Sequence, residues 1–185
     1  SNAMNAIAVV PQGLEEMGAI ELQNLGAQSV KPFKRCVAFE ADLACFYRLH
    51  LQARLPFRFL REISRFKCNS PRSLYLGIQN SFDWYRWLKP SLSFRVNVSG
   101  FSSGLSHTHF TALQVKNALV DLQRHFWGCR SDIHLQNPDI CIHVHLKEGE
   151  AVLSLDGSSE SLHRRGYRAA MGEAPLKENL AAGLV

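Results

Sequence analysis

The sequence lacks the glycine-rich motifs by which many nucleotide-dependent enzymes are identified. Its 185 residues include no P-loop and no G-x-G-x-x-G that opens a helix after a strand, and we expect Ser102-Ser103-Gly104 to be only a loop. Carboxylates with a reason to lie together, as general acid–base catalysis requires, are missing too. We therefore expect no catalytic residues in this chain.

Cysteines and long apolar runs are scarce as well. The five cysteines are odd in number and form no C-x-x-C pair, which argues against a disulfide framework and a cysteine zinc site. No apolar run approaches the roughly 20 residues needed to cross a bilayer, and no basic-then-apolar signal opens the chain. With 46% hydrophobic and 20% charged residues, the composition is typical of a globular protein, which we expect to be cytoplasmic.

One predicted strand could supply three metal ligands. Cys141, His143 and His145 alternate along residues 139–146, and alternate residues of a strand share a face. A sheet face also accommodates Cys and His without a metal, and no further ligand follows at a suitable spacing. We therefore predict no metal site.

Positive charge is concentrated in the middle of the chain. The formal net charge is +5, and residues 57–105 carry eight Lys/Arg against two acidic residues, Glu62 and Asp83. Such a basic sector attracts phosphate backbones without sequence preference, but it can equally be a solubilising surface. Its cationic residues are Arg58, Arg61, Arg65, Lys67, Arg72, Arg86, Lys89 and Arg95.

The first third of the chain has the pattern of alternating strands and helices. Gly26 follows a helical stripe of apolar residues, Asp42 is a suitable N-cap for the next helix, and Pro56 ends that helix. The resulting order, β-α-β-β-α-β, is typical of a ferredoxin-like domain. The expected elements are strands 7–10, 30–34, 35–41 and 57–66 and helices 13–25 and 43–54.

Residues 70–155 combine strands and helices in a different order. The clearest helix, 108–126, carries apolar residues at steps of three and four up to Phe126, whereas Gln123 lies off this stripe. Gly128 provides the stop. We also expect two short helices within 70–90 and strands at 94–98, 139–146 and 151–155.

Three aromatic residues, Trp84, Tyr85 and Trp87, cluster shortly before Pro90. Such rings could stack on nucleobases, but they more often pack between two layers of a domain. The pattern therefore favours core packing.

The most cationic segment, residues 161–168, reads Ser-Leu-His-Arg-Arg-Gly-Tyr-Arg. Its three guanidinium groups match phosphate oxygens, and Tyr167 offers a face on which a base can stack. Composition alone would favour a solvated charge run. The position of the segment, directly after a strand hairpin, favours contact with a polyanion instead.

The two ends of the chain lead to two further expectations. Residues 1–3, ahead of Met4, are typical of what a cleaved expression tag leaves behind. Pro175 occupies a first helical position, and Leu176, Leu180 and Leu184 follow at helical spacing without a cap. We therefore expect a further domain to follow.

Together these segments resemble the N-terminal region of the THUMP-containing bacterial large-subunit (23S) ribosomal RNA guanine-N2 methyltransferases. The resemblance covers nearly everything after residues 1–3, and residues 162–168 are its most specific part. It implies an α+β chain with a ferredoxin-like domain at 4–68 and a THUMP domain at 69–165 that docks structured RNA. Residues 166–185 would be the linker and the start of an S-adenosylmethionine-dependent methyltransferase domain. The other matching segments are Gly13-Leu14-Glu15-Glu16, Leu74-Tyr75-Leu76-Gly77, 94–100, 115–121 and Asn137-Pro138-Asp139-Ile140.

The resemblance also implies a division of roles between this chain and the rest of such a protein. The family's glycine-rich cofactor loop and Asn-Pro-Pro-Tyr motif do not occur here. We expect the chain to bind ribosomal RNA without a cofactor and without methyl transfer of its own, whereas the full-length protein uses S-adenosylmethionine. The residues expected to contact RNA are Arg95, Lys116, Arg164, Arg165 and Arg168, with Tyr167 as a stacking residue.

Two other functions stay open. The chain could be the THUMP part of another RNA-modifying enzyme, such as one that methylates or thiolates transfer RNA, although residues 162–168 disfavour this. It could also be a protein-interaction domain in which the aromatic cluster at 84–88 is an exposed docking patch.

Overall fold

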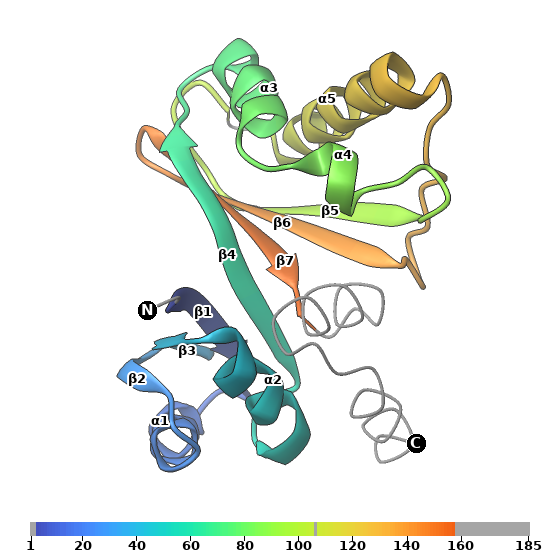
Figure 1. Cartoon of the computed structure of the whole chain (residues 1–185). Helices are drawn as coiled ribbons and strands as arrows, with labels where there is room; N and C mark the ends of the chain where they lie inside the picture. Colours follow the sequence, from blue (N-terminus) through green and yellow to red (C-terminus); the bar gives the residue numbers. More distant parts are fainter. Residues whose placement is uncertain (1–2, 106, 158–185) are drawn as a thin grey trace. The chain divides into compact units, whose positions relative to one another are not determined.

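The computed structural model describes residues 3–105 and 107–157 and contains both helices and strands, as the predicted α+β class requires (Figure 1). The described residues form two units. The first contains the residues up to Arg61 together with Asp156 and Gly157, and the second contains Glu62–Leu155. Strand β4 (Arg58–Lys67) begins in the first unit and ends in the second.

The first unit has the predicted ferredoxin-like order of elements. Its strands are neighbours in the order β2-β3-β1-β4, and the pairs β2–β3, β3–β1 and β1–β4 are antiparallel. Each predicted element is present, with ends that differ by a few residues. Besides β4 they are β1 (Met4–Val9), α1 (Glu15–Asn24), β2 (Gln28–Phe33), β3 (Cys36–Ala41) and α2 (Leu43–Gln52).

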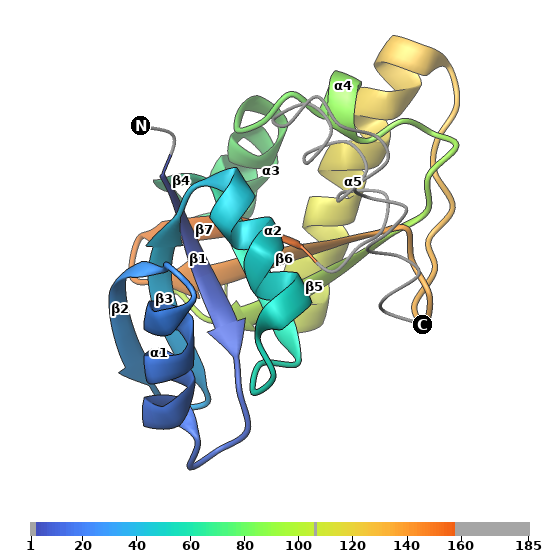
Figure 2. The same ribbon diagram turned by 60° about the horizontal axis from the view of Figure 1, so that its bottom comes forward.

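One face of this sheet is buried beneath both helices (Figure 2). Alternate residues such as Ala8, Val37 and Phe59 point to that face, because successive strand residues point to opposite sides. They pack with Leu22 of α1 and Leu49 of α2 in one hydrophobic core. Burial of this face stabilises the unit.

Asp42 caps α2 as predicted. Its Oδ1 accepts a hydrogen bond of 2.7 Å from the backbone N of Cys45, which would otherwise have no partner within the first turn. The residue is in extended conformation, with ψ of 171°, so the cap also marks where the strand geometry ends.

The second unit is a mixed sheet with its helices on one side. Its strands are neighbours in the order β4-β7-β6-β5, and β5 and β6 are parallel, with α5 between them in the chain. β6 and β7 form an antiparallel hairpin. The elements are α3 (Pro71–Asn80), α4 (Trp84–Trp87), β5 (Phe94–Gly100), α5 (Thr108–Trp127), β6 (Ile140–Lys147) and β7 (Glu150–Asp156).

The helices cover the apolar face of β5 and β6. Phe94, Ile142 and Val144 are fully buried, and so are Val115 and Leu119 on α5. Figure 1 shows α3 and α5 side by side over this face. Residues that alternate with the buried ones, including Arg95, therefore lie on the opposite face of the sheet.

Helix α5 has nearly the predicted bounds, but the prediction of its buried side was partly wrong. Gly128 ends it in the left-handed conformation, with φ of 73°. Gln123, off the predicted apolar stripe, is only 3% exposed, whereas Phe126, on the stripe, is 50% exposed. Gln123 is buried because its amide hydrogen-bonds the irregular segments around Leu88 and Ser131, whose backbone groups have no strand partner there.

Among the described residues, no helix is both long enough and apolar enough to cross a membrane.

Candidate nucleic-acid interface

Arg95 is held in place on the face of the sheet opposite to α5. Its Nε donates to Asn97 Oδ1 at 2.8 Å, and Nη1 donates to the carbonyl of Leu135 at 2.7 Å. β5 is the edge strand of the second unit. The guanidinium is thus pre-positioned at the edge of the sheet, which lowers the entropy lost when it contacts a phosphate.

A row of polar side chains shares this face with Arg95. Asn97 Nδ2 donates to Cys141 Sγ at 3.3 Å, and Ser99 Oγ lies 2.8 Å from His145 Nδ1. Partial burial lowers the pKa of His145, and Lys147 lowers it further, which favours the neutral imidazole. The face therefore offers neutral donors and acceptors beside one fixed cation.

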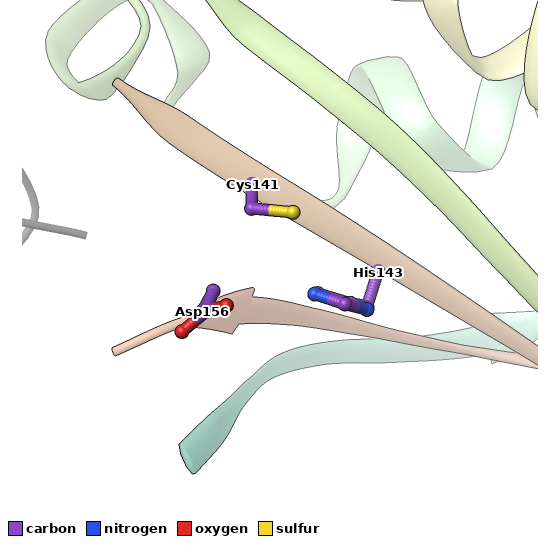
Figure 3. Close-up of side chains that lie close together, drawn as sticks. All are labelled: Cys141, His143 and Asp156. Atoms are coloured by element: carbon purple, nitrogen blue, oxygen red, sulfur yellow. The ribbon is translucent and has the colours of Figure 1, made fainter. Parts of the chain in front are cut away.

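Cys141 and His143 lie close to Asp156, the last residue of β7 (Figure 3). One ligand atom from each of the three lies within 4.8 Å of the others. Thiolate, imidazole and carboxylate form a donor set that suits zinc. Arg58 Nε is 3.6 Å from Asp156 Oδ2, however, and a guanidinium there competes with a metal ion for the carboxylate.

This cluster differs from the candidate set Cys141, His143 and His145 considered from the sequence, because Asp156 takes the place of His145, whose Nδ1 lies 2.8 Å from Ser99 Oγ. Asp156 belongs to β7, so the spacing of residues along β6 could not reveal it. The prediction that the protein holds no metal stays a prediction.

The other predicted RNA contacts are found elsewhere or lie outside the described residues. Lys116 lies in the third turn of α5, half-buried, in the helical layer rather than on the face of Arg95. That Arg95 and Lys116 contact RNA stays a prediction. The contacts predicted at Arg164, Arg165, Tyr167 and Arg168 fall outside the part of the chain that the structure describes.

The basic sector at 57–105 divides into two groups of cations. Arg58 pairs with Asp156, and Arg65 pairs with Glu62 at 2.6 Å and Glu150 at 3.0 Å. Arg61 is largely shielded from solvent, and this burial lowers the pKa of its guanidinium. Among the described residues, no ion pair involves the remaining cations of the sector, which all lie in the second unit: Lys67, Arg72, Arg86, Lys89 and Arg95.

The aromatic cluster belongs mainly to the core, as its sequence pattern favours. Trp84 is 4% exposed and donates from Nε1 to the carbonyl of Ile78 at 2.7 Å, and Leu88 is 1% exposed. Tyr85 differs, since half of its surface is exposed. The interpretation as core is confirmed for Trp84 and wrong for Tyr85.

Sequence reasoning missed that Tyr85 meets Phe126 and Trp127, the last two residues of α5. The sequence carried no clear signal of this contact, because adjacent residues of a helix can all be buried, as Ala118, Leu119 and Val120 are.

Comparison with known protein families identifies both parts of the chain. The RlmL ferredoxin-like domain matches residues 5–60, and the THUMP domain matches residues 78–156. The first range nearly coincides with the first unit up to Arg61, whereas the second lies almost entirely within the second unit but begins well after its start at Glu62. The domain boundaries predicted at 68 and 165 stay predictions.

Relatives with RNA methyltransferase names match nearly the whole chain. A Synechocystis protein, named provisionally as an RNA methyltransferase, is 46% identical over 96% of this chain and 46% of its own length. The ribosomal RNA large subunit methyltransferase K/L of Ectopseudomonas mendocina is 43% identical over the whole chain and 25% of its own length. The chain thus spans between a quarter and a half of these relatives.

Solved structures share the fold. A Listeria monocytogenes protein, predicted to be an N6-adenine-specific DNA methylase, is 26% identical with a TM-score of 0.67, over 98% of this chain and 47% of that one. SMU.472, described as a methyltransferase and solved with SAH, is 24% identical with a TM-score of 0.68, over 100% of this chain and 48% of that one. The second likeness supports the fold alone.

Proposed function

Because the chain contains an RlmL ferredoxin-like domain and a THUMP domain, and is homologous to ribosomal RNA large subunit methyltransferases, we propose that it is the RNA-binding module of such an enzyme. In this proposal it captures a folded segment of large-subunit ribosomal RNA. It then positions a guanine for N2 methylation by a catalytic domain elsewhere in the same protein.

Unpaired cations within the THUMP match are the observation that carries the proposal. Arg86, Lys89 and Arg95 lie within the residues that match the THUMP domain, and none of them is in an ion pair among the described residues. The first unit also has described cations outside ion pairs, such as Lys31 and Lys34, so the position within the THUMP match is what distinguishes these three. Cations of this kind suit phosphate binding by shape, because A-form grooves hide base edges from side chains.

We further propose that the full-length enzyme uses S-adenosylmethionine, bound outside the residues described here. The family's glycine-rich cofactor loop does not occur in this sequence, so we assign its residues no chemical step.

The salt dependence of RNA binding tests the proposed function. Fluorescence anisotropy with a labelled ribosomal RNA hairpin should show affinity falling at least about tenfold between 50 and 200 mM salt, because several phosphate contacts release counterions. Arg95→Gln should weaken binding and reduce the slope of log K against log salt by about one. Arg65→Gln is the matched control, since Arg65 is already paired with two carboxylates.

Two results would contradict the proposal. One is a flat salt response, and the other is an equal loss of affinity in both arginine variants. Transfer RNA and duplex DNA of equal length serve as competitors. Stronger competition by transfer RNA would favour the THUMP part of a transfer RNA enzyme, and stronger competition by DNA would reject RNA as the ligand class.

A further inference from the structure

The end of α5 and the helix α4 expose a group of packed aromatic rings. Tyr85 and Phe126 are each 50% exposed, and Trp127 is 37% exposed. The same last turns of α5 bury the polar side chain of Gln123. The usual preference for buried aromatic and exposed polar residues is thus reversed here, which is typical of a surface that binds something.

The three rings form one surface, which we call the aromatic platform (Tyr85, Phe126 and Trp127). Tyr85 and Trp127 are stacked, with centroids 4.8 Å apart and planes at 13°. Phe126 meets Tyr85 edge to face at 5.3 Å. Contacts between α4 and α5 hold the rings together before any ligand arrives, so little side-chain entropy remains to be lost on binding.

Three cations lie at or near the aromatic platform in the chain. Lys89 Nζ lies 5.4 Å from the centre of the Trp127 ring, and Arg86 lies over the ring of Trp87 at 5.7 Å. Arg124 is exposed in the last turn of α5. Among the described residues these three cations have no carboxylate within ion-pair distance. Flat apolar rings with a cationic rim complement a base and its flanking phosphates.

We propose that the aromatic platform binds an unpaired RNA nucleotide by stacking. The base stacks on the exposed surface of the aromatic platform, and Lys89 and Arg86 contact the adjoining phosphates. The ligand is single-stranded, because a base within a duplex has both faces covered by its neighbours. This inference rests on the proposed function and narrows it to RNA in which a helix adjoins an unpaired end or loop.

Two RNA probes separate this inference from general RNA binding. One is a blunt ribosomal RNA hairpin closed by a compact tetraloop whose bases stack on one another, and the other is the same hairpin with a six-nucleotide single-stranded 3′ extension. The chain should bind the extended hairpin more tightly. Tyr85→Ala should lower affinity for the extended hairpin by about tenfold, the effect of losing one base–aromatic stack, and leave the blunt hairpin unchanged.

Conservative and distant variants keep the test specific. Tyr85→Phe retains the ring and should restore binding of the extended hairpin, which a merely unfolded variant could not do. Phe110→Ala is the matched control, because Phe110 is also exposed on α5, at 49%, but lies at the opposite end of the helix. Trp127→Ala should reproduce the loss seen with Tyr85→Ala.

The outcomes are distinguishable. Equal affinity for both hairpins, unaffected by Tyr85→Ala, overturns this inference and leaves the proposed function intact. Failure to bind either hairpin overturns both. Concentration-dependent dimerisation that Tyr85→Ala abolishes, without any change in RNA binding, would assign the aromatic platform to a second copy of the chain and also overturn the inference.

Discussion

Single residues in the family-like segments have structural tasks that the sequence does not display. Tyr75 Oη donates to Asp121 Oδ2 at 2.5 Å, which joins α3 to α5 and raises the pKa of the phenol. Asp139 Oδ2 accepts from the backbone N of Ser93 at 2.8 Å, which joins the starts of β5 and β6. A residue can therefore match a family segment because it shapes the fold, without touching RNA.

Gln123 provides the sharpest test at this scale. Its Nε2 donates to the Leu88 carbonyl and to Ser131 Oγ, and its Oε1 accepts from the backbone N of Ser131 at 2.8 Å. Gln123→Ala should lower the free energy of unfolding of the second unit by about 2–4 kcal/mol, because buried backbone groups lose their partners. Urea denaturation followed by circular dichroism measures this loss.

Gln114→Ala is the control for Gln123→Ala. Gln114 lies on the same helix, is half-buried and makes one hydrogen bond, of 3.1 Å, to the Pro71 carbonyl. The control should cost about 1 kcal/mol or less. Equal losses in both variants would show that the buried network around Ser131 contributes nothing beyond helix packing.

At the scale of elements, α3 and β4 approach closely because of one glycine. A Cβ at Gly77 of α3 would fall on the ring of Phe66 in β4. This explains why glycine suits the segment Leu74-Tyr75-Leu76-Gly77 even though glycine is a poor helix former. The close contact between α3 and β4 therefore depends on the absence of a side chain at Gly77.

Substitution at Gly77 should therefore destabilise the protein despite a better helix propensity. Gly77→Ala gains up to about 1 kcal/mol in propensity but forces the Phe66 ring to move, at a cost of about 1–3 kcal/mol. In a Phe66→Ala background the same substitution should be neutral or stabilising. Thermal unfolding of the unchanged protein, the two single variants and the double variant gives the coupling free energy between Gly77 and Phe66. A coupling near zero would mean that the Phe66 ring moves aside at no cost.

At the scale of the whole molecule, each unit has its own core. Phe94 is fully buried in the second unit, and Phe39, at 3% exposed, is buried in the first. The second unit also carries the aromatic platform and the cations near it. The units are therefore expected to differ in function as well as in fold.

The separate cores predict separate responses to mutation. Phe94→Ala should remove about 3–5 kcal/mol by opening a cavity, and hydrogen exchange should rise in residues 62–155 while residues 4–57 keep their protection. Phe39→Ala is the matched substitution and should show the reverse pattern. Loss of protection throughout the chain in either variant would show that the two units unfold as one.

Much of the fold could be predicted because its signals are local. The Asp42 cap, the Gly128 stop and the alternating strands each depend on residues within a few positions of one another, so the order of elements in both units follows from them. The basic sector was visible for the same reason, since charge can be counted along the chain. The contacts of each side chain with other elements could not be predicted, because the spacing of residues along one helix or strand does not reveal which residues of another element pack against it.

The sequence by itself therefore determined which elements form and where positive charge is abundant. Only the tertiary structure decided which cations are neutralised, as in the bond from Arg65 to Glu150 across 85 positions. It also decided that Gln123 is buried and that Tyr85 stacks on Trp127. Secondary structure arises from short-range backbone geometry, whereas pairing and exposure arise from contacts between distant segments that exist only once the chain has folded.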